Sequence, residues 1–285
     1  MADANNSAAP ATLPLERLSL NQITVKQLSL PEVVEACGRF GIDTLSAWRD
    51  PIAEVGIDEA ERVVKDAGLR VSSVCRGGFF PYKDDLDRQR MIADNRAAVE
   101  EAARLGADCL VLVCGGATGD PRDIDRARDQ IREGIELLLP YAIELDVPLG
   151  IEPLHPAMVT RSAITSLGEA NDLAESFDSS HVGVVIDVYH VFWDKYLERE
   201  IRRCGANGNI LGFHVCDWLD VPSLEIFQGR GMMGDGVIDI PRIRSLIDEA
   251  GYDGPIEVEV ISAANWQRPA DSVIQDVIHT FQESA

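Results

Sequence analysis

Four polar residues stand at the ends of apolar, strand-like segments in the second half of the chain: Glu152 in GIEPLH, Asp187 in VVIDVYH, His214 in LGFHVCD and Glu259 in PIEVEVIS. If they converge, three carboxylates and an imidazole need a cation between them, because like charges in close contact repel and raise one another's pKa. Three oxygen donors and one nitrogen suit Mn²⁺, Mg²⁺ or Co²⁺, and are compatible with Zn²⁺ and Fe²⁺. The residue types therefore predict a divalent metal site, with about two positions of an octahedron left for substrate oxygens.

Convergence of these side chains requires strands that end at one face of a sheet. Short apolar segments alternate with amphipathic helical patterns such as residues 88–106 and 122–146, which is typical of βα units around a parallel sheet. The eight strand-like segments are residues 17–23, 43–48, 70–76, 108–115, 147–154, 182–190, 210–217 and 255–262. Eight repeats favour an α/β fold of the (β/α)8 TIM barrel type. An open doubly wound sheet is the alternative, although no G-x-G-x-x-G motif follows the first strand.

The length of 285 residues is ordinary for a single barrel domain. We expect a disordered N-terminal tail over residues 1–15 and one catalytic TIM barrel domain over residues 16–285. Glycines that precede the strands, such as Gly41, Gly68 and Gly106, are expected to end helices in the left-handed conformation. The long non-periodic segment 217–236 follows the seventh strand and is predicted to be an active-site loop.

Composition excludes several kinds of partner. The formal net charge of -22 argues against nucleic acid, because a polyanion would be repelled. No apolar run reaches the length of about 18 residues that a membrane span needs, so no membrane partner is expected. Six scattered cysteines without a CxxC pair, and an N-terminus without a basic start or an apolar segment, predict a cytoplasmic protein.

Two histidines are candidates for contact with substrate. His190 belongs to an Asp-x-x-His motif that leads from a strand end into a loop, where its imidazole can approach the metal site. His155 lies between two prolines directly after Glu152, and a substrate contact and a structural loop role are both open. Glu257 lies two residues before Glu259, so both side chains point to the same face of the strand. Glu257 is expected to lie one layer deeper in the barrel, or to be the ligand itself if the strand is shorter.

Further substrate contacts are expected from residues near the strand ends and in the long loop. A structural role is the alternative for each of them. They are Arg230, Arg76, Trp48 and Asp217.

The order Glu, Asp-x-x-His, His, Glu on the last four strands, with the segments DVYH, FHVCDW and GDGVIDIPRIRSLIDEAGYDGPIEVEV, resembles the xylose isomerase-like barrels from about residue 16 onward. These include sugar isomerases, epimerases and type IV apurinic endonucleases. Within the ketose 3-epimerase and inosose isomerase branch, the resemblance implies that Glu152, Asp187, His214 and Glu259 hold a Mn²⁺-type ion. It also implies that Glu152 and Glu259 exchange protons with substrate from opposite faces, and that His190 contacts a substrate oxygen.

Two departures bear on the substrate. Met158 and Asp220 stand where ketose 3-epimerases of this group carry a glutamate and an arginine, which argues against a free ketohexose. The resulting hypothesis is an isomerase or epimerase of a sugar, keto-sugar or cyclitol that removes a proton α to a carbonyl through an enediolate. A lyase of the dehydratase or C-glycoside deglycosidase type, acting on a 3-keto-sugar, is the alternative because its first step is the same.

Two other classes of protein, a DNA-repair endonuclease and a metal-free binding module, are further alternatives. A DNA-repair endonuclease would need more histidine ligands than the five in the chain, and a metal-free binding module would show no bound ion. The expected partner is a small carbohydrate, and a homo-oligomer or an accessory subunit remains open.

Overall fold

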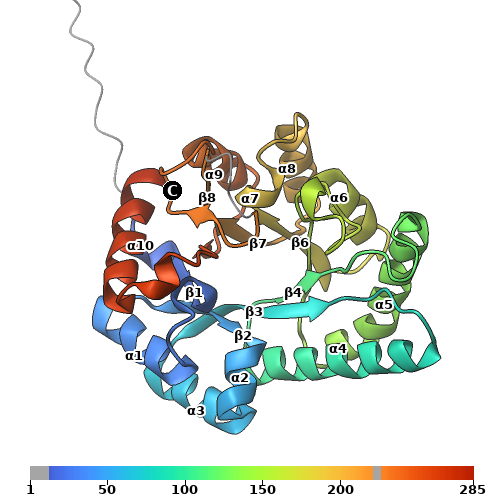
Figure 1. The fold of residues 1–285 in the computed structure, drawn as a ribbon, viewed down its shortest axis with the longest axis horizontal. Coiled ribbons are helices and arrows are strands. Elements are labelled where there is room, and N and C mark those ends of the chain that lie inside the picture. The colour runs from blue at the N-terminus through green and yellow to red at the C-terminus, as the bar shows by residue number, and fades with distance from the viewer. Residues whose placement is uncertain (1–12, 221–225) are drawn as a thin grey trace, which may run out of the picture.

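The computed structural model describes residues 13–220 and 226–285, and its centre is a closed barrel of eight parallel strands (Figure 1). The barrel order is β1–β10–β7–β6–β5–β4–β3–β2, which confirms the TIM barrel and rules out the open sheet. Its strands are β1 (Leu18–Asn21), β2 (Thr44–Trp48), β3 (Arg70–Gly78), β4 (Leu110–Val113), β5 (Leu149–Glu152), β6 (Val182–Asp187), β7 (Ile210–Val215) and β10 (Ile256–Val258). Most of the predicted tail, residues 1–12, lies outside the described part of the chain.

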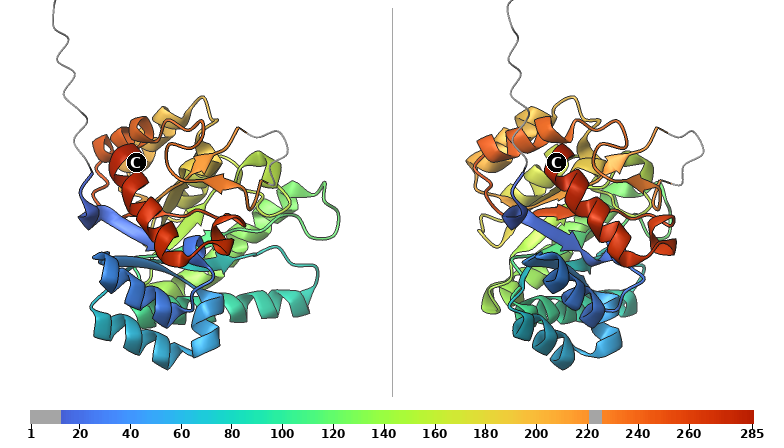
Figure 2. Two further views of the ribbon diagram at one scale, coloured as in Figure 1. Left: turned by 60° about the vertical axis from the view of Figure 1, so that its left-hand side comes forward. Right: turned by 90° about the vertical axis from the view of Figure 1, so that its left-hand side faces the viewer.

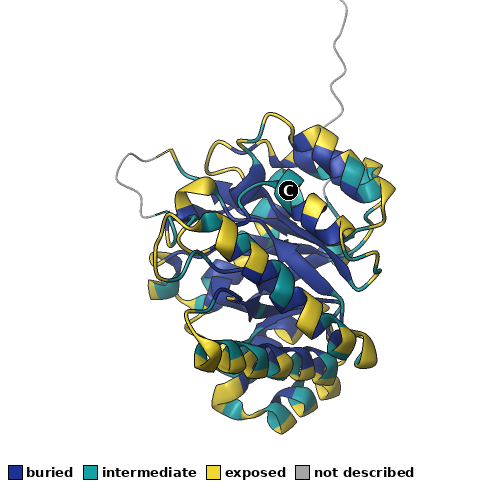
Figure 3. Cartoon of the chain, turned by 90° about the vertical axis from the view of Figure 1, so that its right-hand side faces the viewer, coloured by how far each residue is buried: buried dark blue, intermediate teal, exposed yellow. Residues whose placement is uncertain are grey.

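Helices cover the outside of the barrel. They are α1 (Leu30–Phe40), α2 (Arg49–Val55), α3 (Ile57–Ala67), α4 (Asp85–Leu105), α5 (Ile124–Glu144), α6 (Leu167–Glu175), α7 (Val188–Val191), α8 (Leu197–Ala206), α9 (Ile240–Glu249) and α10 (Ala270–Ser284). Apart from the short α7, whose four residues are buried, their outward faces are exposed while the strands are buried (Figure 3). Figure 2 shows α10 beside the first strand, and there the backbone N–H of Leu13 donates to the carbonyl of Gln282 at 3.2 Å.

Local sequence signals set the ends of several helices. Ser29 and Glu32 form a capping box at the start of α1, and the Asp84 side chain accepts from the backbone at the start of α4. Gly41 and Gly106 end these helices with φ of 68° and 62°, as predicted, because only glycine adopts this conformation without a steric cost. Each glycine returns the chain to the next strand.

The register of the last strands aligns the predicted site. Asp187 on β6 pairs with His214 on β7, and His214 pairs with Glu257 on β10. The segment predicted as a strand over residues 182–190 stops at Asp187, because the Asp187 side chain accepts from the backbone N–H of Tyr189 and begins the short helix α7. The correction leaves Asp187 at the carboxyl end of its strand and moves His190 into a helical turn.

The segment after β7 is more regular than the predicted loop. It contains an antiparallel ribbon of β8 (Asp217–Trp218) and β9 (Arg230–Gly231), in which Trp218 pairs with Arg230. The ribbon turns Arg230 back toward the barrel, where its backbone N–H donates to the carbonyl of Ile261. Residues 221–225 of this segment lie outside the described part.

Apolar packing fills the rest of the molecule. All six cysteines are buried, where a thiol packs as a small hydrophobic residue. Within the two described ranges, no helix combines the length and apolar character that crossing a bilayer demands.

Candidate metal centre

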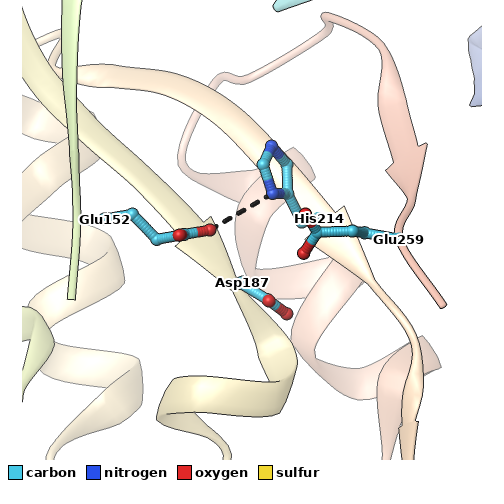
Figure 4. A group of neighbouring side chains, drawn as sticks. All are labelled: Glu152, Asp187, His214 and Glu259. Carbon is cyan, nitrogen blue, oxygen red and sulfur yellow. Dashed lines mark ion pairs between the residues drawn. The ribbon is translucent and has the colours of Figure 1, made fainter. Parts of the chain in front are cut away.

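The structure brings together the four residues that the sequence singled out. Glu152, Asp187, His214 and Glu259 each offer a ligand atom, and these atoms lie within 4.8 Å of one another (Figure 4). Glu152 and Asp187 are the last residues of β5 and β6, His214 lies near the end of β7, and Glu259 follows β10 directly. All four are at most 5 % exposed. The centre therefore lies at the carboxyl ends of the strands, where active sites of such barrels are found.

Several buried atoms of the centre that could bind a cation lack a hydrogen-bond partner. Nδ1 of His214 lies 3.4 Å from Oε1 of Glu152, which is too long for a good hydrogen bond. Within the described part of the chain, this oxygen and both ring nitrogens of His214 have no hydrogen-bond partner. Buried polar atoms are rarely left in this state, because each costs free energy. One histidine and three carboxylates together favour a divalent metal.

The pKa values of Glu259 and His214 are raised, and neighbouring carboxylates contribute to both shifts. Burial raises the pKa of Glu259 to about 8, and the neighbouring carboxylate of Glu152 contributes in the same direction. Burial acts to lower the pKa of His214, but the carboxylates of Glu257, Glu152 and Glu259 outweigh it and raise that pKa to about 10. Glu259 is thus an acid that is hard to ionise at this position without a further counter-charge.

Glu257 lies beneath the centre, as predicted, and its hydrogen bonds are made to the barrel interior. Its Oε1 accepts from Nδ2 of Asn21 at 2.6 Å, and its Oε2 accepts from the hydroxyls of Ser72 and Ser73, each at 2.9 Å. Oε1 also lies 3.4 Å from Nε2 of His214. The sequence prediction did not include Asn21, Ser72 or Ser73. Polar residues within otherwise apolar inner strands were the signal that could have found them.

Arg230 lies directly against the predicted ligands. Its Nη1 is 2.8 Å from Oδ2 of Asp187 and 2.8 Å from Oε2 of Glu259. The guanidinium lies over the ring of Tyr189, 4.5 Å from its centroid, and Nη2 is 3.3 Å from Nε2 of His190. Because the side chain is only 3 % exposed, water screens little of the attraction between its positive charge and these carboxylates.

His190 is buried beside Arg230, and a backbone N–H group of the segment after β5 fixes its ring. Its Nδ1 accepts from the backbone N–H of His155 at 3.2 Å, and its Nε2 lies 3.6 Å from Oδ2 of Asp187. Burial lowers the pKa of His190 to about 3, so its imidazole is neutral. The ring nitrogen Nε2 therefore faces the centre from a fixed position.

His155 has a clear structural role in the segment after β5. Its Nδ1 accepts from the backbone N–H of Ala157, which starts a short 3-10 helix at Pro156–Met158. Its ring packs against Trp218, with 5.0 Å between centroids. His155 acts on the site by positioning His190 through its backbone N–H.

Two more of the residues expected to contact substrate, Trp48 and Arg76, lie beside the metal centre. Trp48 and Arg76 line a small inner cavity of about 40 Å³ beside the centre, together with Glu152, His190 and Arg230. Nε1 of Trp48 also donates to Oδ1 of Asn21 at 2.7 Å.

Asp217 does not line this cavity. We interpret it as a structural residue rather than the substrate contact expected from the sequence. Its side chain is fully buried. Its carboxylate accepts hydrogen bonds from the backbone N–H groups of Trp218, Gly234, Gly236 and Ile238. These contacts fold the glycine-rich part of the loop around a single anion.

The family model of the xylose isomerase-like TIM barrel matches residues 34–282. The chain belongs to this family. A crystallised protein of Sinorhizobium meliloti is 46 % identical, with a TM-score of 0.92 over 95 % of this chain and 99 % of that one. An inosose isomerase of Halalkalibacterium halodurans is 21 % identical over 94 % of this chain and 95 % of its own length. The L-ribulose-5-phosphate 3-epimerase UlaE of Salmonella paratyphi A is 24 % identical over 75 % and 71 %.

Proposed function

We propose that this protein is a divalent-metal-dependent isomerase or epimerase of a sugar, keto-sugar or cyclitol. The observation that carries the proposal is the buried cluster of Glu152, Asp187, His214 and Glu259, whose donor atoms converge within 4.8 Å. Membership of the family and the similarity to an inosose isomerase and a ribulose-phosphate epimerase support the same class of reaction. Mn²⁺ is the proposed ion, with Mg²⁺, Co²⁺ and Zn²⁺ as alternatives for the same donors.

The two glutamates are the proposed acid–base pair. Glu152 on β5 and Glu259 after β10 are separated by β6 and β7 in the barrel order, so they approach the centre from different sides. One carboxylate removes a proton α to the substrate carbonyl, and the other returns a proton from the opposite face. When bound, the divalent ion supplies Lewis-acid stabilisation of the negative charge on the substrate oxygens.

Neighbouring residues hold the substrate for this exchange. Arg230 donates N–H groups toward the centre from a buried position, and Nε2 of neutral His190 faces the same space. Trp48 and Arg76 close the inner cavity on the side of β2 and β3. The small cavity restricts water around the reacting carbon, which strengthens electrostatic interactions with it.

Incorporation of deuterium from solvent tests the proposal directly. The purified protein, loaded with Mn²⁺ or Zn²⁺, is offered a panel of ketoses, ketose phosphates, inososes and 3-keto-glycosides, and products are followed by NMR. Exchange at the carbon beside the carbonyl, lost in Glu152→Gln and Glu259→Gln variants that still bind the ion, supports the proposal. A metal-loaded protein that exchanges no proton in any of them would contradict it, and the ultraviolet absorbance of an enone product would instead identify the lyase.

A further inference from the structure

A second chamber shares part of its lining with the inner cavity, and two arginines belong to the shared part. The chamber measures about 210 Å³ and is lined in part by Gln22, Lys26 and Trp266. Arg76 and Arg161 line both the chamber and the inner cavity. A substrate whose reacting carbon lies at the metal centre would therefore extend between these two guanidinium groups.

These cations lack the carboxylate partners that are common elsewhere in the molecule. The chain has 48 acidic and 26 basic residues, and Arg49 next to the chamber pairs with both Asp94 and Glu101. In the described part of the chain, neither Arg76 nor Arg161 forms an ion pair with a carboxylate. An acidic protein that leaves two arginines of one chamber without a carboxylate partner keeps their charge available for a ligand.

Aromatic rings hold the cations in place instead. The Arg76 guanidinium lies 5.5 Å from the ring centroid of Trp48, and that of Arg161 lies 4.0 Å from the centroid of Phe227. On the outer wall, Nζ of Lys26 lies 4.9 Å from the centroid of Trp266. Cation–π contacts orient these groups without neutralising their charge.

A buried amide adds a donor to the same wall. Gln22 is 1 % exposed, and its Oε1 accepts from the backbone N–H of Trp48 at 3.2 Å. Its Nε2 has no hydrogen-bond partner within the described part of the chain. The chamber thus combines guanidinium, ammonium and amide N–H groups, and Asp50 is the one carboxylate among its lining residues.

We propose that this chamber binds an anionic group of the substrate, a phosphate or a carboxylate, between Arg76 and Arg161. The inference rests on the proposed function, because it places the reacting carbon at the metal centre. A neutral sugar ring presents hydroxyls that both donate and accept hydrogen bonds, whereas this wall offers mainly donors. Phosphate and carboxylate only accept, and guanidinium groups bind both of them well.

Anion binding gives the first test, and it does not depend on catalysis. The metal-loaded protein and its Arg76→Gln/Arg161→Gln double variant are titrated with inorganic phosphate and with acetate by calorimetry. Arg96→Gln is the matched control, because Arg96 also lies over an aromatic ring, that of Tyr141, and has no ion pair in the described part. We expect the affinity for one of the two anions to fall at least tenfold in the double variant and to be unchanged in the control. Equal affinities in all three proteins would overturn the proposal, provided that their circular dichroism and thermal unfolding agree.

Matched substrates give the second test. Deuterium exchange is compared for D-ribulose and its 5-phosphate, for D-fructose and its 6-phosphate, and for a ketose that ends in a carboxylate. The expected kcat/KM is at least tenfold higher for an anionic member, through KM, and the double variant removes this preference. A neutral preference in the unmodified protein would refute the anionic subsite. Phosphate affinity that depends on the two arginines, without exchange in any substrate, would retain the subsite and refute the proposed reaction.

Discussion

Oε1 of Glu257 lies 3.4 Å from Nε2 of His214, on the edge of the imidazole opposite to the one that faces Glu152. The two residues are register partners on β10 and β7, and both are buried. A carboxylate behind a ligating histidine fixes the orientation and the tautomer of its ring. Glu257 is therefore placed to act on the metal centre through His214 rather than as a ligand.

Replacing this carboxylate should weaken metal binding. In Glu257→Gln the ring of His214 loses its anionic partner, and we expect the affinity for Mn²⁺ to fall by about 10- to 100-fold. Calorimetric titration of the metal-free protein with Mn²⁺ measures the change. Glu283→Gln is the control, because Glu283 makes a comparable contact of 3.3 Å with His279 on the surface. Equal affinities in the two variants would show that Glu257 serves only the packing of the barrel.

Metal binding should stabilise the fold. A ligand that binds only the native state adds about 2.7 kcal/mol to the free energy of unfolding when its concentration is about 100 times its Kd. Urea unfolding with EDTA or with excess Mn²⁺ should show this gain in the unmodified protein and its loss in Asp187→Asn. Asp66→Asn is the control, since Asp66 also accepts from an arginine Nη1, at 2.9 Å, on the surface. A gain that persists in Asp187→Asn would remove Asp187 from the ligand set.

The loop after β7 should depend on Asp217. In Asp217→Ala four backbone N–H groups lose their acceptor, of which that of Ile238 is buried, and a buried unmet group costs roughly 1–3 kcal/mol, whereas water partly relieves the others. We expect a loss of about 3 kcal/mol in unfolding free energy and faster amide hydrogen exchange at Gly234 and Gly236. Asp239→Asn, at the start of α9, is the comparison, because asparagine caps a helix as well as aspartate does. Unchanged exchange at both glycines would mean that other contacts hold the loop.

Buried thiols should make the protein less stable at high pH. Burial raises the pKa of Cys204 from 9 to about 12, so the thiol ionises in the unfolded chain before it does in the native one. Its contribution to stability is complete below pH 9 and is lost as the pH rises from 9 to 12, by about 1.4 kcal/mol at pH 10. Unfolding free energies at pH 8 and 10 should therefore differ by about 1.4 kcal/mol less in Cys204→Ala and Cys204→Ser than in the unmodified protein. Identical pH dependence in all three would refute the prediction.

The barrel was predictable because its signals are local. Apolar segments of strand length, helical periodicity and terminating glycines such as Gly41 and Gly106 are readable within a few residues. Closure of a parallel sheet then requires that successive strands end at the same face. For that reason Glu152, Asp187 and His214 could be grouped from their positions at strand ends alone.

The roles of Arg230 and Asp217 could not be read in this way. Both lie in a segment without periodicity, and their partners are set by how the β8–β9 ribbon folds back over the barrel. The strand-like segment 182–190 also extends three residues too far, because the apolar run continues past Asp187 while the backbone turns into α7. A side chain that caps a helix overrode the pattern there.

The amino-acid sequence by itself determined the barrel and the residue types at its mouth, since both follow from alternation and spacing along the chain. Only the tertiary structure decided which charged groups share a site: Arg230 with Asp187 and Glu259, Glu257 behind His214, and Arg76 and Arg161 in the lining of one chamber. Electrostatic interactions depend on distance in space and on burial, and neither quantity is contained in the order of the residues.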